Sequence, residues 1–83
     1  MSASIKSEDR LRQTVAEVLG VTTNLLSEES SPSTISSWDS LGHLNLVIAL
    51  EEEFEVNLSA DEVLAMHNMG SIRRILHQYG VEI

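Results

Sequence analysis

Residues 38–54 read WDSLGHLNLVIALEEEF, and this stretch decides the fold of the chain. A polar loop turns at Ser40 into what we expect to be the most apolar helix in the sequence. The N-terminus of a helix attracts anions, because its free N–H groups and its dipole favour negative charge. The position of Ser40 therefore suits a covalently attached phosphodiester. An ordinary N-cap serine fits the same pattern, although Asp39 could supply that cap equally well.

The helix predicted from Ser40 to about Glu55 has two apolar faces in its first half. An advance of about 100° per residue gathers one group of side chains along the full length of the helix. That group consists of Leu46, Val47, Leu50 and Phe54, with His43 among them. The opposite face carries Leu41, Leu44 and Ile48. A small domain can bury only one of the faces, so we expect the longer stripe in the core. The shorter patch would remain exposed beside Ser40, with Glu51 and Glu52 on later turns, as a docking surface for a partner.

Length and composition limit the classes of protein that this chain can belong to. We expect residues 1–83 to form a single domain with one small core, which leaves little room for the deep pocket of an autonomous enzyme. The chain has no cysteine, which excludes disulfides and thiolate metal sites. It contains neither a run of about 18 apolar residues nor the pattern of a signal peptide. We therefore predict a cytoplasmic protein that does not enter the membrane and has no metal site.

The charge of the chain is strongly acidic and unevenly distributed. Five Lys and Arg residues stand against 13 Asp and Glu residues, which gives a net charge of -8. No lysine or arginine lies between Arg12 and Arg73. Nucleic-acid binding needs basic groups against phosphates, so this distribution argues against it. An acidic surface instead suits protein partners with basic faces.

The rest of the sequence predicts an all-α fold, a small bundle of three longer helices and one short one. An apolar stripe that ends at Leu19-Gly20 predicts the first helix. The aperiodic segment 21–37 is expected to bridge two helices that run in roughly the same direction. Ser59 and Glu62 form a capping-box pattern that opens a short helix, and Ser71 is the expected cap of the last helix.

This arrangement resembles the acyl carrier protein family. The resemblance rests on Asp39-Ser40-Leu41 at the head of a helix that ends Ala49-Leu50-Glu51-Glu52-Glu53-Phe54, and it extends over nearly the whole chain. It implies that a phosphopantetheinyl transferase moves 4′-phosphopantetheine from coenzyme A onto Ser40. The terminal thiol of this arm would then hold acyl groups as thioesters and present them to enzymes of lipid, fatty-acid or polyketide-type biosynthesis.

The resemblance also assigns roles to other residues. Asp39 matches the motif aspartate that helps to position the transferase. The recognition positions of the family's second helix correspond to Leu41, Leu44, Ile48, Glu51 and Glu52, and they imply that acyl-loading and acyl-processing enzymes dock there with basic faces. The family implies a monomeric carrier without catalytic residues.

The sequence departs from common members of the family around the serine. Peptidyl carriers usually have a glycine pair before the motif, where this chain has Ser36, Ser37 and Trp38, and this favours acyl over amino-acyl cargo. Fatty-acid carriers tend to have acidic residues where Gly42 and Asn45 stand. A specialised stand-alone carrier is therefore expected. The alternatives are an amino-acyl carrier of peptidyl or D-alanyl type, and a carrier-like interaction module that is never modified.

His43 lies three residues after Ser40 and raises the question of a serine-hydrolase triad. The Gly-x-Ser-x-Gly elbow is missing, and His43 falls on the predicted core face, so we expect a packed or capping histidine. His67 and His77 lack the spacing of a paired metal site. The sequence does not decide whether Trp38 covers the core or belongs to the partner surface.

Overall fold

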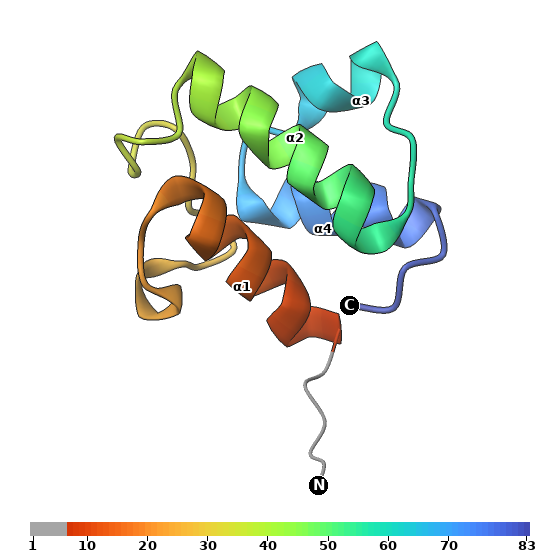
Figure 1. Ribbon diagram of the computed structural model, residues 1–83, viewed down its shortest axis with the longest axis horizontal. Coiled ribbons are helices and arrows are strands. Elements are labelled where there is room, and N and C mark those ends of the chain that lie inside the picture. Colours follow the sequence, from red (N-terminus) through yellow and green to blue (C-terminus); the bar gives the residue numbers. More distant parts are fainter. Residues whose placement is uncertain (1–6) are drawn as a thin grey trace, which may run out of the picture.

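The structure, a computed structural model, describes residues 7–83, and these residues form four α-helices and one short 3-10 turn (Figure 1). The elements are α1 (Ser7–Leu19), η1 (Thr23–Leu25), α2 (Ser40–Phe54), α3 (Ala60–Ala65) and α4 (Met69–Gln78). The predicted all-α class, with three longer helices and one short one, is confirmed. Within residues 7–83, no helix combines the length and apolar character that a bilayer crossing requires.

The core lies between α1, α2 and α4, and each of these helices buries apolar side chains against the other two. The buried side chains of α2 are Leu46, Val47, Leu50 and Phe54. They meet Leu11, Val15 and Leu19 of α1 and Ile72, Ile75 and Leu76 of α4. Leu26, Ile35 and Trp38 from the segment before α2 belong to the same cluster, as do Ala16, Met66 and Met69. The choice of the longer α2 stripe as the core face is therefore correct.

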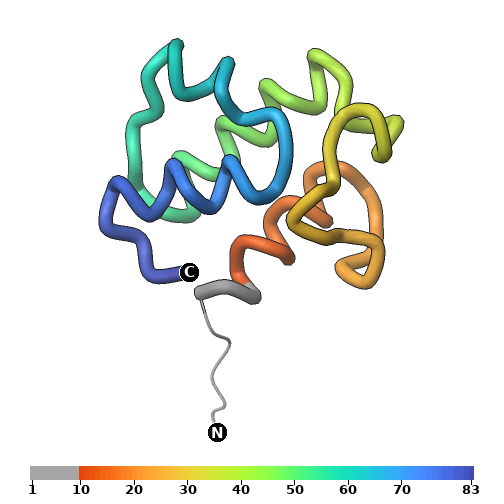
Figure 2. Tube along the Cα trace, turned by 180° about the vertical axis from the view of Figure 1, so that it is seen from behind, coloured from red at the N-terminus to blue at the C-terminus, as the bar shows by residue number. Residues whose placement is uncertain are grey.

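The direction of α2 relative to α1 differs from our expectation. Both views show the two helices running antiparallel, not in the same direction (Figures 1 and 2). The physical reason is that segment 21–39 does not span the length of the bundle. It folds back on itself and covers one end of the core, where Leu26, Ile35 and Trp38 are buried.

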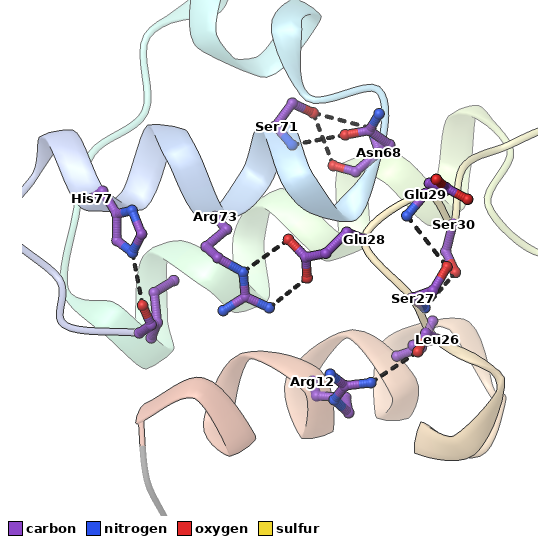
Figure 3. Close-up of polar contacts among 11 residues, drawn as sticks. Arg12, Leu26, Ser27, Glu28, Glu29, Ser30, Asn68, Ser71, Arg73 and His77 are labelled. Atoms are coloured by element: carbon purple, nitrogen blue, oxygen red, sulfur yellow. Dashed lines mark hydrogen bonds and ion pairs between the residues drawn. The ribbon is translucent and has the colours of Figure 1, made fainter.

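Two arginines fasten this long connection to the helices (Figure 3). Arg12 of α1 donates to the carbonyl of Leu26 at 2.8 Å. Arg73 of α4 forms a bidentate pair with Glu28, with N···O distances of 3.0 and 2.7 Å, and holds the pKa of that carboxyl below its usual value through these hydrogen bonds. The backbone of Gly70 donates to the carbonyl of Glu28 at 2.9 Å. The connection is therefore a fixed part of the fold.

The ends of the helices follow local signals, with one correction. The predicted capping box of Ser59 and Glu62 opens α3. The expectation that Ser71 caps the last helix is wrong, because α4 begins at Met69 with Asn68 as its N-cap. The Asn68 side chain accepts from the Ser71 amide at 2.7 Å, while the Ser71 hydroxyl accepts from the Asn68 amide at 3.0 Å. Ser71 thus occupies the third position of a capping box, and Asn68 is as good a cap as serine.

Candidate functional site

The first turn of α2 presents Ser40 to solvent. Asp39 is the N-cap, and its Oδ1 accepts from the amide of Gly42 at 2.8 Å. The first backbone bond of the helix joins the amide of His43 to the carbonyl of Asp39 at 2.8 Å. Asp39 therefore fills the capping role that the sequence left open between the two residues. Ser40 is the first residue of the helix and is exposed, so its hydroxyl is accessible to chemistry.

Gly42 lets the preceding loop pack against this turn. A Cβ atom at residue 42 would lie 2.2 Å from the backbone carbonyl oxygen of Ser37 and 3.3 Å from Oδ1 of Asp39. The first of these distances is impossible for a real carbon atom, so any side chain here would displace the loop. The departure from the acidic residue expected at Gly42 therefore has a steric reason.

A chain of hydrogen bonds joins Trp38, His43 and Val63. Trp38 is 1 % exposed, which places it in the core and settles the question that the sequence left open. Its Nε1 donates to Nδ1 of His43 at 3.0 Å, and Nε2 of His43 lies 2.9 Å from the carbonyl oxygen of Val63. Both ring nitrogens are engaged away from Ser40, so His43 is the packed histidine that the sequence predicts and not a general base for the serine.

A shallow open groove of about 630 Å³ runs beside Ser40, between the start of α2 and α3. The segment around the start of α2 lines it with Trp38, Asp39, Ser40, His43 and Leu44, the segment around α3 lines it with Val63, Leu64, Met66 and His67, and Pro32 also lines it. The contribution of α3 was not predicted. Leu64 is 81 % exposed and lines the same groove as Leu44, and this depends on how the short helix folds back.

The outer face of α2 has the exposure that the helical periodicity predicts. Leu41, Leu44 and Ile48 are 67 %, 57 % and 54 % exposed, so they form an apolar patch next to Ser40. Glu52 is also exposed. Glu51 is different, because its Oε2 accepts from the amide of Leu58 at 2.8 Å and so helps to fix the connection to α3. Of the two carboxylates predicted to contact a partner, Glu51 therefore also stabilises the chain after α2, and Glu52 does not accept from Leu58.

The N-terminal end of α3 is fixed through Glu62. Its carboxylate accepts from the hydroxyl of Tyr79 and, at 2.9 Å, from the amide of Ser59. The hydrogen bond from Tyr79, followed by those from Ser59, lowers the pKa of Glu62. The ionised carboxylate thus links α3 to the end of α4.

Comparisons with known proteins agree on the kind of domain that carries this site. The family model described as a phosphopantetheine attachment site matches residues 9–76. Among solved structures, the solution NMR structure of a holo acyl carrier protein from Geobacter metallireducens is similar, with a TM-score of 0.72 and 23% sequence identity. The match covers 95% of this chain and 97% of that one. At this identity, the likeness establishes the fold.

Proposed function

The chain belongs to the family of phosphopantetheine-attachment carrier domains, and from that premise we propose that Ser40 is the residue that carries the arm. The domain is a carrier and not an enzyme, and a phosphopantetheinyl transferase modifies it. When attached, 4′-phosphopantetheine supplies the thiol that a chain without cysteine lacks. The observation that carries the proposal is the exposed hydroxyl of Ser40 at the first residue of α2.

The residues around Ser40 fit the group. Asp39 already caps the helix, so modification of Ser40 removes no hydrogen bond on which α2 depends. The first helical bond starts at the amide of His43, and Asp39 accepts from the amide of Gly42, so only the amides of Ser40 and Leu41 are left without a bond inside the helix. A phosphodiester at this end of the helix is favoured by about 0.3–1 kcal/mol. Asp39 is exposed beside the serine and can also position the transferase.

We propose acyl groups as the cargo, for lipid, fatty-acid or polyketide-type biosynthesis. The groove beside Ser40 offers the apolar side chains of Leu44, Leu64 and Met66. Of its polar side chains, Trp38 and His43 are bonded to each other and to the backbone of α3, while Asp39, Ser40 and His67 also line the groove. An amino-acyl group would bring an ammonium ion, which gains nothing from these apolar side chains and could pair only with Asp39, whose carboxylate already caps α2.

The outer face of α2 is the proposed docking surface for the enzymes that load and process the cargo. Leu41, Leu44 and Ile48 supply apolar area close to the arm, and Glu52 adds a negative charge further along the helix. A partner that matches this surface has an apolar contact flanked by basic groups. The carboxylate of Glu51 contributes charge to the same surface while it holds the amide of Leu58.

The assignment of Ser40 is tested with coenzyme A, Mg²⁺ and a broad-specificity phosphopantetheinyl transferase. We expect the intact mass of the wild-type protein to increase by one phosphopantetheine. The Ser40→Ala variant should remain unmodified, whereas the matched control Ser36→Ala, at an exposed serine in the preceding loop, should react as the wild type does. An unmodified wild type, or a modified Ser40→Ala variant, would contradict the assignment.

A further inference from the structure

The short helix α3 is attached to the bundle mainly through its two ends. None of the residues Ala60–Ala65 is fully buried, so packing alone holds this helix weakly. Its N-terminal end is fixed through Glu62, which accepts from Tyr79 and Ser59. Towards its C-terminal end, the carbonyl of Val63 meets Nε2 of His43 at 2.9 Å. The imidazole of His43 therefore joins α3 to α2, and both His43 and Val63 line the groove.

The direction of these hydrogen bonds determines which nitrogen of His43 carries the hydrogen. An indole N–H can only donate, so Nδ1 of His43 must accept from Trp38. A carbonyl oxygen can only accept, so Nε2 must carry the hydrogen and donate it to Val63. The two contacts are satisfied together only by the neutral Nε2–H tautomer. The ring planes of Trp38 and His43 are inclined by 18° to each other, which is compatible with this bond.

We propose that His43 is a positioning residue that couples the buried ring of Trp38 to α3 and so fixes the wall of the groove beside Ser40. Trp38 is 1 % exposed and immobilised by the core, and the bond to it orients the imidazole. The imidazole in turn holds Val63, next to Leu64 in the groove wall. An arm attached to Ser40 would lie against this fixed apolar wall. That consequence for the cargo rests on the proposed function.

The tautomer is tested by NMR on the full-length protein before modification. Long-range ¹⁵N spectra of His43 should show Nε2 protonated and Nδ1 as an acceptor, and the indole N–H of Trp38 should exchange slowly with water. The variant Trp38→Phe removes the donor and should shift the Nδ1 resonance, while the spectrum of His77 serves as the unaffected reference. A protonated Nδ1, or a rapidly exchanging Trp38 indole, would overturn the proposal.

Three substitutions of His43 separate its role in holding α3 from simple packing. His43→Leu removes both hydrogen bonds. The side-chain amide of His43→Asn can still accept from Trp38 but is too short to reach the carbonyl of Val63. His43→Gln has a longer amide that can still donate to Val63. Loss of one hydrogen bond corresponds to about a tenfold change in local opening. We therefore expect amide exchange in α3 to become about tenfold faster in the Leu and Asn variants and to be restored in the Gln variant.

Exchange in α1 and the variant His67→Gln are the controls, because His67 lines the same groove without this link. Unchanged α3 exchange in His43→Leu, or no rescue by His43→Gln, would overturn the proposal. If His43→Leu loses its helical circular dichroism, the comparison of amide exchange between the Gln and Asn variants still tests the proposal.

The effect on the groove is measured on the holo-protein with a solvent-sensitive fluorophore attached to the thiol of the arm. In His43→Leu, we expect the emission to shift towards the value of the fluorophore in water. In His43→Gln, the emission should return to the wild-type value. The control Ile48→Ser, on the outer face of α2, should leave the emission unchanged. Equal emission in all variants would contradict the coupling. If no arm is attached at all, the proposed function fails instead, while the NMR and exchange results stand independently.

Discussion

Replacement of Gly42 by alanine tests whether close packing of the loop shapes the turn that presents Ser40. The added Cβ would lie 2.2 Å from the carbonyl oxygen of Ser37. Ordinary contacts need about 3.5 Å, so the loop or the start of α2 must move by more than about 1 Å. The obstacle is backbone and not the end of a flexible side chain, so the strain cannot be relieved by a rotamer change.

Two opposing contributions determine the size of the effect. Overpacking of this kind costs about 1–3 kcal/mol. Alanine is favoured over glycine in a helix by up to about 1 kcal/mol, which offsets part of that cost. We expect a net loss of about 1–2 kcal/mol in the free energy of unfolding for Gly42→Ala, which lowers the melting temperature of a domain of this size by about 4–16 °C.

Urea unfolding followed by circular dichroism measures this loss. The matched control is Asn45→Ala, at an exposed position on the next turn of α2, which should gain up to about 0.7 kcal/mol from helix propensity alone. A Gly42→Ala variant that is as stable as the wild type, or more stable, would refute the steric role of Gly42.

Three further substitutions test other parts of the site. Ile48→Asp should impair acyl transfer by partner enzymes while the helical signal and the stability remain, and loss of the helical signal would mean that Ile48 belongs to the core. Asp39→Ala should cost about 1 kcal/mol of stability, because the cap on Gly42 is lost, and slow the transferase; an unchanged stability would contradict the capping role. The lowered pKa of Glu62 means that its ionised form stabilises the fold above its ordinary pKa near 4.5, and that this stability is lost as the pH falls through the lower folded value. Glu62→Gln should therefore flatten the acid side of the stability profile, and an unchanged slope would exclude the contribution of this group.

The helices and their faces could be predicted because they depend on local patterns. The periodicity of α2 correctly separates Leu50 and Phe54 in the core from Leu41 and Ile48 at the surface. The capping box at Ser59 lies within four consecutive residues and can also be predicted from the sequence. The last helix begins earlier than predicted, because Asn68 and Ser71 cap it reciprocally.

The parts that could not be predicted depend on contacts between distant segments. The antiparallel course of α1 and α2 depends on a long connection that folds back over the core, and no periodic signal encodes this. The link from Trp38 to Val63 through His43 joins residues 25 positions apart. The tight contact that requires Gly42 involves a backbone carbonyl, and the sequence alone carries no sign of it. The engagement of Glu51 with the amide of Leu58 likewise depends on how the chain leaves α2.

The mass of the protein isolated from its native cell tests the central claim most directly. Tandem mass spectrometry of the peptide that contains Ser40 should locate one phosphopantetheine on that serine, and the arm released from it should carry an acyl group as a thioester. An amino-acyl group on the arm would contradict the proposed cargo. A Ser40 peptide that bears no phosphopantetheine at any stage of growth would contradict the account as a whole.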